Sequence, residues 1–176
     1  MYKLQFVTES DFQTLIDWSG DERFLLQWAG PSMNYPLDKK QLKSFLYGSN
    51  NKDSSDRMIY KAIESETGQM VGHISLGMLN HKHRTGRIGR VLVSPAKQGE
   101  GIGEWMMREV CQIGFEEFNL HRIGLGVFDF NIGAIRCYEK IGFQRDGLLR
   151  EVVSVQGDYW NMIEMSLLEN EWQGSI

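Results

Sequence analysis

The pattern of apolar and polar positions in the N-terminal part of the chain predicts one strand and two helices. Apolar and polar side chains alternate over residues 1–7, as in a half-buried strand, and apolar residues three and four apart follow over residues 12–18, as on one face of a helix. A second helix is expected to begin after Asp38, an N-cap residue, and to end near Gly48. Residues 19–36 hold two glycines and two prolines among many apolar side chains. We therefore expect a loop there that packs over the core or over a pocket.

The rest of the chain alternates between short apolar runs, which predict strands, and longer segments with helical spacing. Strands are expected at residues 58–63, 70–76, 87–93 and 123–128, and a closing hairpin at residues 143–168. Helices are expected at residues 103–118, with a wide apolar stripe, and at residues 131–141. This order contains no internal repeat and no linker. It predicts a single mixed α/β domain over residues 1–176, with helices on both faces of a sheet.

Composition and charge narrow the class of protein and of partner. Of the 176 residues, 41% are hydrophobic and 24% are charged, which is typical of one globular domain that folds around its own core. The 19 basic and 23 acidic residues give a net charge of −4, and no run of Lys and Arg is long enough to follow a phosphate backbone. Nucleic acid is therefore not an expected partner.

Cysteine usage and hydropathy predict a cytoplasmic protein. Cys111 and Cys137 fall in expected helices and form neither a CxxC pair nor a cluster with histidines, so we expect reduced thiols and no metal site. The N-terminus lacks the apolar run of a signal peptide, and no stretch approaches the roughly 20 apolar residues of a membrane span. We accordingly expect no membrane partner.

A glycine-rich loop between an expected strand and an expected helix carries the first chemical signal. Its residues are Gln98, Gly99, Glu100, Gly101, Ile102, Gly103 and Glu104. Glycines let a ligand approach the backbone closely, and the N–H groups at the start of a helix point outward at its positive end. We expect an anion there, most naturally a diphosphate, because successive amides form a concave set of donors. The alternative is that the glycines only make a tight connection from strand to helix.

Two nucleotide-binding patterns fit this loop poorly. A P-loop requires GxxxxGK[ST], and no Lys-Ser or Lys-Thr pair follows the glycines. A dinucleotide-binding loop requires GxGxxG, but Glu104 stands at the third glycine position and the loop comes late in the chain. The pattern (Gln/Arg)-x-x-Gly-x-(Gly/Ala) remains, and Gln98, Gly101 and Gly103 meet it.

A second segment makes the signal more specific. It reads Asn131-x-x-Ala134-x-x-x-Tyr138-Glu139-Lys140-x-Gly142-Phe143, on an expected strand–helix–strand unit. With both segments in this order, the chain resembles the GNAT superfamily of N-acetyltransferases, in particular the branch with ribosomal-protein N-terminal, spermidine and aminoglycoside acetyltransferases. The resemblance is dense over residues 91–143 and topological elsewhere. It implies a GNAT-like α/β (α+β) fold, with a mixed, mostly antiparallel sheet whose fourth and fifth strands are splayed.

The resemblance implies acetyl-CoA as co-substrate and assigns its parts to the chain. In similar enzymes the pantetheine arm binds the backbone of the fourth strand, here Val91, Leu92 and Val93, and the amides of residues 98–104 bind the pyrophosphate. Asn131 is implied as a further cofactor contact, and it can also be a helix N-cap. Tyr138 matches the tyrosine that protonates the leaving thiolate in similar enzymes. An aromatic residue on the apolar face of a helix can equally belong to the core.

The implied reaction is direct attack of a primary amine, of a small molecule or of a peptide N-terminus, on the acetyl group in a ternary complex. An amine with an ordinary pKa near ~10.4 must first lose a proton. The sequence departs from several similar enzymes here, because Gly126 and Arg87 stand where those enzymes often have acids. The remaining candidate bases are His73, Glu151 and Glu164, and each can also be a core or surface residue.

Residues 19–36 are implied as the region that selects the amine. The candidates there are Asp21 and Glu22, which can attract a cation, and Phe24, Trp28 and Tyr35, which can form walls or pack onto the core. Two other classes stay open, namely an acyl-CoA-binding sensor without transfer activity and a nucleotide-binding regulatory domain. A homodimer is common among similar enzymes and is a further expectation.

Overall fold

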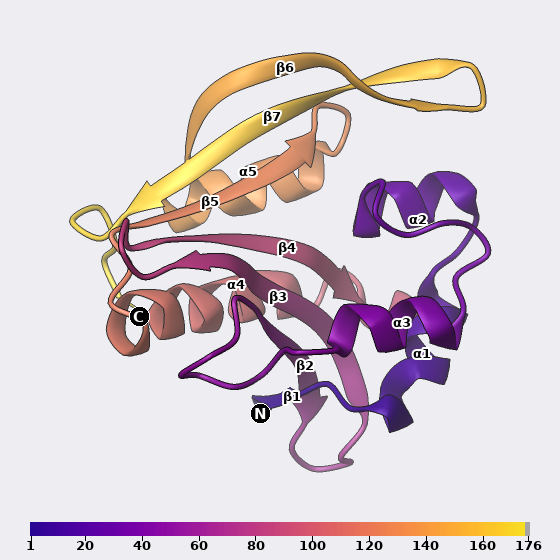
Figure 1. Ribbon diagram of the computed structural model, residues 1–176, viewed down its shortest axis with the longest axis horizontal. Helices are drawn as coiled ribbons and strands as arrows, with labels where there is room; N and C mark the ends of the chain where they lie inside the picture. Colours follow the sequence, from indigo (N-terminus) through magenta and orange to yellow (C-terminus); the bar gives the residue numbers. More distant parts are fainter. Residues whose placement is uncertain (175–176) are drawn as a thin grey trace.

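Seven strands form one sheet in the spatial order β1-β2-β3-β4-β5-β7-β6 in the computed structural model, which describes residues 1–174 (Figure 1). The strands are β1 Tyr2–Phe6, β2 Met58–Glu64, β3 Met70–Asn80, β4 Thr85–Val93, β5 Arg122–Phe128, β6 Gln144–Val155 and β7 Asp158–Leu168. Neighbouring strands are antiparallel except β4 and β5, which run parallel. The expected mixed, mostly antiparallel sheet is confirmed.

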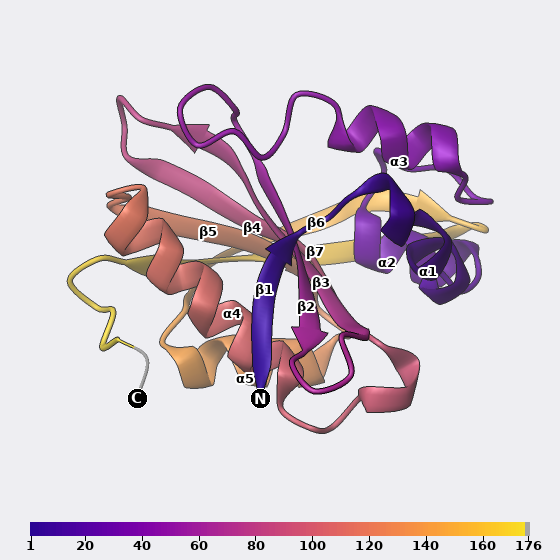
Figure 2. The same cartoon turned by 90° about the horizontal axis from the view of Figure 1, so that it is seen from below.

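Helices cover both faces of this sheet, as expected. They are α1 Phe12–Trp18, α2 Glu22–Ala29, α3 Lys39–Leu46, α4 Ile102–Gln112 and α5 Ile132–Ile141. Figure 2 shows α4 and α5 close together on the left of the view, with α1, α2 and α3 grouped on the right. Successive side chains of β2 point to opposite faces of the sheet. Met58 and Tyr60 pack in the hydrophobic core between the sheet and α4 and α5, whereas Ile59 packs in the core between the sheet and α1, α2 and α3.

The expectation of a loop over residues 19–36 is wrong, because α2 lies within it. Asp21 begins this helix, and its side chain accepts a hydrogen bond from the backbone N–H of Phe24 at 2.8 Å. Gly30 ends the helix with a φ of 70°, a conformation that favours glycine. Leu25 anchors it in the core. The glycines and prolines that indicated a loop mark the boundaries of a short helix.

The helix after the glycine loop changes its winding near its end. α4 continues into a π-helical turn over Ile113–Glu117. Gly114 lies in this turn, and a Cβ atom there would stand 2.7 Å from Cδ1 of Ile123 on β5. The glycine therefore allows the turn to pack closely against the sheet, and this contact fixes the helix behind β5.

β4 and β5 separate soon after they begin. Their recorded pairs are Thr85 with Arg122, Gly86 with Ile123, and Arg87 with Gly124. Beyond this point the two strands diverge, as Figure 1 shows, while β5 continues to pair with β7 along its whole length. The expected splay of the fourth and fifth strands is confirmed. It leaves one edge of β4 without a strand partner among the described residues.

Candidate functional site

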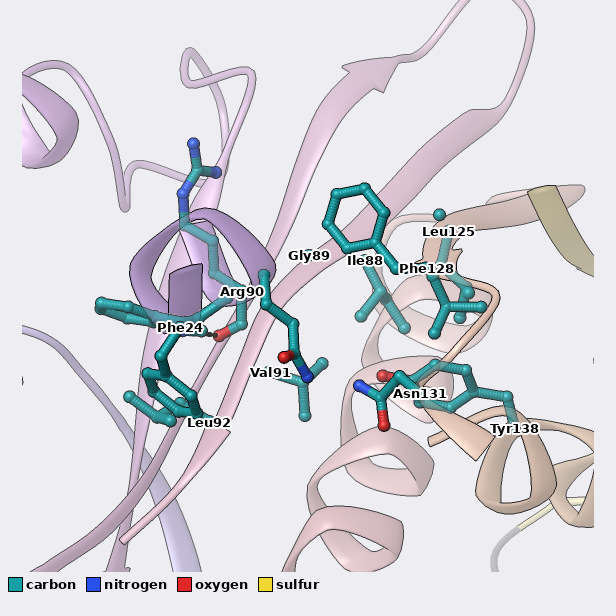
Figure 3. A pocket seen from close by; sticks show the side chains of 14 residues that line it. Phe24, Ile88, Gly89, Arg90, Val91, Leu92, Leu125, Phe128, Asn131 and Tyr138 are labelled. Carbon is teal, nitrogen blue, oxygen red and sulfur yellow. Dashed lines mark hydrogen bonds between the residues drawn. The ribbon is translucent and has the colours of Figure 1, made fainter. Parts of the chain in front are cut away.

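A hollow of about 110 Å³ occupies the gap between β4 and β5 (Figure 3). Residues 88–92 of β4 and 125–128 of β5 form two of its walls, and Asn131 and Tyr138 add a third. Three side chains of α2 close it on the remaining side. Val91, Leu92, Asn131 and Tyr138, which the resemblance assigned to one reaction, therefore meet in one place. Val93 and residues 98–104 do not line the hollow.

A second space, which we call the wide groove, continues from the hollow and measures about 490 Å³. The two spaces share residues of α2, β4 and β5. The other walls of the wide groove are residues 29–32 at the end of α2 and directly after it, Ser75, Gly77 and Met78 of β3, Arg87 of β4, and Val152, Val153 and Met162 of the β6–β7 hairpin. A molecule bound in the wide groove can thus reach the hollow.

The glycine loop joins the end of β4 to the start of α4. Gly99 and Gly101 have φ angles of 86° and 80°. Apart from the adjoining residues of the chain, no described residue has an atom within 4 Å of the position that a Cβ would take. α4 begins at Ile102 without a side-chain cap, whereas α2, α3 and α5 each begin at a capping Asp or Asn. The first N–H groups of α4 therefore remain available to an anion.

The other loop residues divide between solvent and protein. Gln98 and Glu100 are exposed, whereas Ile102 is buried in the core. At Gly103 a Cβ would lie 3.6 Å from Cγ2 of Val93, so the start of α4 packs against the end of β4. This packing brings the loop next to the unpaired edge of β4.

The side chain of Glu104 is engaged in ion pairs within the protein. Its carboxylate accepts a hydrogen bond from Lys140 at 2.7 Å and one from Nη2 of Arg108 at 3.1 Å. These two cations, Lys140 first, hold the pKa of Glu104 below its usual range. The side chain links α4 to α5, so a contribution of Glu104 to a ligand would come from its backbone N–H.

α5 brings Asn131 and Tyr138 to the wall of the hollow. The Asn131 Oδ1 accepts a hydrogen bond from the backbone N–H of Ala134 at 3.3 Å, which confirms the N-cap role. Tyr138 is buried, and its hydroxyl bonds to no residue of the described chain. Burial raises the pKa of Tyr138 above its usual value. The phenol is protonated at neutral pH, as an ordinary tyrosine also is, and it has a proton to donate into the hollow.

A bulge in β4 shapes the wall of the hollow, and the sequence did not reveal it. Two residues of β4, Arg90 and Val91, oppose one residue of β3, Ile74. Arg90 has a φ of 52°, in the left-handed region where a residue other than glycine is strained. Its carbonyl oxygen accepts a hydrogen bond from Nε1 of Trp28 at 3.0 Å and one from Nδ1 of His73 at 2.8 Å. These two contacts hold the bulge in place.

His73, a candidate base, lines neither the hollow nor the wide groove. It is 1% exposed, and its ring packs against Trp28 and Phe45. Burial lowers the pKa of His73 to about 4. The ring is therefore neutral at pH 7, and it acts as a hydrogen-bonded core residue beside the bulge.

Gly126 and Arg87 belong to one arrangement with Glu164. Glu164 of β7 pairs with Gly126 of β5, and Arg87 of β4 donates two hydrogen bonds to the Glu164 carboxylate, at 2.7 Å and 2.6 Å. A Cβ at Gly126 would stand 2.9 Å from Nη2 of Arg87 and 2.6 Å from Sδ of Met162. The glycine therefore makes room for the arginine, and the arginine balances the charge of the carboxylate.

The aromatic candidates of residues 19–36 separate into two groups. Phe24 and Trp28 lie on α2 and line the hollow. Tyr35 is 54% exposed and lines neither the hollow nor the wide groove. Two of the three aromatic residues are thus placed where they can contact a substrate.

The acidic candidates lie outside both spaces. Asp21 caps α2, and the Glu22 carboxylate accepts a hydrogen bond at 2.9 Å from Gln156 in the β6–β7 turn. Glu151 is exposed on β6. None of the three lines the hollow or the wide groove, so they do not provide a cation-binding wall there.

Over residues 1–174, no group of three or more His, Cys, Asp and Glu side chains is arranged to hold a metal ion. In the same range no helix is long and apolar enough to cross a membrane. Cys111 is buried and Cys137 is half-buried, and both are free thiols.

The chain is similar to known proteins in sequence and in fold. The model of the acetyltransferase (GNAT) family matches residues 15–143. The spermidine N(1)-acetyltransferase of Escherichia coli (strain K12) is 30% identical over 129 residues, which cover 73% of this chain and 67% of that protein. The spermidine N(1)-acetyltransferase of Vibrio cholerae serotype O1 is 27% identical over 127 residues, 72% of each chain. A crystal structure of spermidine N-acetyltransferase from Vibrio cholerae in complex with CoA and spermine shares the fold, with a TM-score of 0.82 at 19% identity over 97% of this chain and 96% of that one.

Proposed function

Because this chain belongs to the acetyltransferase (GNAT) family and transfers the acetyl group of acetyl-CoA to an amine, we propose that the transfer takes place in the hollow between β4 and β5. The observation that carries the proposal is the gap in the sheet. The uncapped start of α4 packs against Val93 on the strand that forms one side of this gap, and the wide groove shares residues with the hollow inside it. The donor binds from the side of the glycine loop, and a small-molecule amine enters through the wide groove. The amine then attacks the acetyl carbon directly while both substrates are bound.

Three parts of the chain fit the donor. The first N–H groups of α4 suit the pyrophosphate, because they are uncapped and lie beside an open glycine loop. The free edge of β4 at Val91, Leu92 and Val93 offers backbone groups to the pantetheine arm. Asn131 uses Oδ1 for the helix cap, which leaves its Nδ2 to donate toward the hollow.

Tyr138 is proposed to protonate the thiolate that leaves when the C–N bond forms and the C–S bond breaks. It lines the hollow, and its phenol carries a proton at neutral pH. A positioned general acid of this kind contributes about 10²- to 10⁴-fold to a rate. Tyr138 would donate its proton to sulfur and recover one from water.

The amine is proposed to lose its proton to water in the wide groove. Among the described residues that line the hollow and the wide groove there is no Asp, Glu or His. The nearby Glu164 forms an ion pair with Arg87, and His73 is buried. The value of kcat/KM is therefore expected to rise with pH toward the pKa of the amine itself, without an earlier plateau set by a side chain.

Thiol release from acetyl-CoA, measured with a mixed panel of small amines and followed by mass analysis of the products, tests the proposal. We expect one acetyl group on at least one amine, and competition of acetyl-CoA with CoA but not with ATP. Binding of CoA without thiol release from any amine would favour the sensor and overturn the proposal. Competition with ATP would favour the nucleotide-binding domain.

We further propose a homodimer that forms through β6. This strand is an edge of the sheet, and its side chains are exposed over nearly all of its length. Leu148, Leu149 and Val152 are exposed apolar side chains on it. A long exposed edge strand with apolar residues favours pairing with another chain. Light scattering is expected to give twice the mass of one chain, and a monomer would contradict the proposal.

A further inference from the structure

The charged side chains that line the wide groove are both cationic. They are Arg87 and Arg90, and within residues 1–174 no Asp or Glu lines this groove. The charge of Arg87 is balanced by its ion pair with Glu164. The Arg90 guanidinium donates a hydrogen bond from Nη2 to Oγ of Ser32 at 2.8 Å, and it forms no ion pair with a described carboxylate. The uncompensated charge of the groove is therefore that of Arg90.

Arg57 adds a second positive charge beside Arg90. Both guanidinium groups lie over the ring of Phe45, at 4.2 Å for Arg90 and 5.9 Å for Arg57. The Nε atom of each is buried without a hydrogen-bond partner in the described part of the chain. The ion pair of Arg57 is a 3.7 Å contact with the exposed carboxylate of Asp56. Two like charges with unsatisfied donors are costly unless a ligand compensates them.

The position of Arg90 connects this charge to the reaction. Arg90 lines the hollow and the wide groove, and it also lines a third space of about 580 Å³ beside α3. In that third space Asp38 caps α3, so its carboxylate is already engaged, while Lys40 adds a further positive charge. Burial lowers the pKa of the Arg90 guanidinium, and Arg57 lowers it further. A positive region thus lies next to the hollow in a chain whose net charge is −4.

We propose that the acceptor is an amine that also carries a carboxylate or phosphate group, and that Arg90, supported by Arg57, binds this anionic group. The inference rests on the proposed function, because it places the amine in the wide groove. An anion at Arg90 would satisfy unpaired guanidinium N–H groups and offset the repulsion between the two arginines. A polycation such as a polyamine would meet like charge at the same place, and its recognition requires carboxylates that this groove lacks.

Matched pairs of amines test the anionic group directly, since the two members differ in that group alone. Suitable pairs are lysine with 1,5-diaminopentane, tyrosine with tyramine, and phosphoethanolamine with ethanolamine, each measured by thiol release. In at least one pair we expect kcat/KM to be about 10- to 100-fold higher for the anionic member, the effect of one or two charge-assisted hydrogen bonds. A higher kcat/KM for the cationic member in every pair would overturn the inference.

Substitution of the arginines tests whether they cause the preference for the anionic member of each pair. Arg90→Gln is expected to remove the preference through a higher KM for the anionic member, while the KM of its partner and of acetyl-CoA changes less than about twofold. Arg57→Gln should lower the preference in the same direction but less. Arg145→Gln is the matched control, because Arg145 pairs with Glu139 and lines neither the hollow nor the wide groove. A preference that survives Arg90→Gln would also overturn the inference.

Failure of the inference and failure of the proposed function give different results. Acetylation of polyamines alone would overturn the inference and leave the proposed function intact. Absence of thiol release from every amine would overturn the proposed function. The inference is then decided by calorimetry on the CoA-loaded protein, where the anionic members should bind the wild type at least about tenfold more tightly than Arg90→Gln. Equal binding to the two proteins would contradict it.

Discussion

The proposed donor side of the hollow consists mainly of backbone groups, whereas the proposed acceptor side consists mainly of side chains. On the donor side, the loop of residues 98–104 presents backbone N–H groups, and its glycines adopt φ angles that other residues rarely take. On the acceptor side, the wide groove is shaped by side chains from α2, β3, β4 and the β6–β7 hairpin. Its charge depends on Arg87, Glu164 and Arg90, which come from two strands of the sheet.

This difference explains why two enzymes of one family can share a donor and differ in acceptor. A donor site made of backbone depends on conformation, so a short sequence pattern is enough to specify it. An acceptor site made of side chains changes its charge with one or two substitutions. The wide groove of this chain carries arginines, although the relatives from Escherichia coli and Vibrio cholerae are named for spermidine, which is a cation.

The largest expected effect concerns Tyr138, where the two sides meet. Tyr138→Phe removes the proposed proton donor and should lower kcat by about 100-fold or more, while the KM for acetyl-CoA changes little. Steady-state kinetics by thiol release measure both quantities. Tyr60→Phe is the matched control, because Tyr60 is also buried with a raised pKa but lies on β2 outside the hollow. An unchanged kcat for Tyr138→Phe would remove this residue from the mechanism.

The donor side is tested by Gly101→Val. A β-branched residue is strained at the φ of 80° observed for Gly101, so the loop of the variant should leave this conformation. Restoring it when CoA binds costs up to about 3 kcal/mol, which raises the Kd of CoA by roughly 100-fold. Calorimetry measures the Kd. The matched control is Gly68→Val in the β2–β3 turn, where φ is 70° and the space is equally open. If both variants bind CoA like the wild type, the loop does not hold the donor.

The bulge between the two sides depends on a neutral His73. Its pKa in the folded state is about 4, below the ordinary value of 6.5, so between these values the unfolded chain binds a proton that the folded chain does not. The free energy of unfolding should therefore fall as the pH is lowered, by about 2 kcal/mol from pH 7 to pH 5.

Urea denaturation of the wild type and of His73→Asn measures this term. Asparagine keeps a donor for the carbonyl oxygen of Arg90 but does not titrate. The fall in the free energy of unfolding between pH 7 and pH 5 should therefore be about 2 kcal/mol smaller in the variant than in the wild type. Glu64, Glu104 and Glu169 have lowered pKa values, and their contributions are lost only at more acidic pH. Equal pH dependence of the two proteins would mean that His73 titrates normally in the fold.

The smallest expected effect concerns the ion pair beside the wide groove. Arg87→Gln leaves the Glu164 carboxylate unbalanced, which should raise kcat/KM for 1,5-diaminopentane relative to lysine by about tenfold. The double variant Arg87→Gln with Glu164→Gln removes both charges and should restore the ratio of the wild type. If the single variant leaves the ratio unchanged, this pair does not contribute to acceptor choice.

Sequence patterns predicted the elements whose signals are local. The glycine loop, the Asn131 cap and most strands were correct, because each depends on residues that are neighbours in the chain. The helix α2 was missed although its signals were present, namely the cap Asp21 and the terminal Gly30. The glycines and prolines of residues 19–36 were interpreted as evidence for a loop, whereas they flank the two ends of a helix.

The sequence by itself determined the family pattern, the glycine loop before α4 and the positions of Asn131 and Tyr138, because backbone conformation and helix capping follow from short stretches of residues. Tertiary structure alone decided the bulge at Arg90, the engagement of Glu164 by Arg87 and the approach of Arg57 to Arg90. These features depend on strand register and on packing between distant segments. No local pattern encodes the distance between two charges on different strands, so the chemistry of the acceptor side emerged only when the chain was folded.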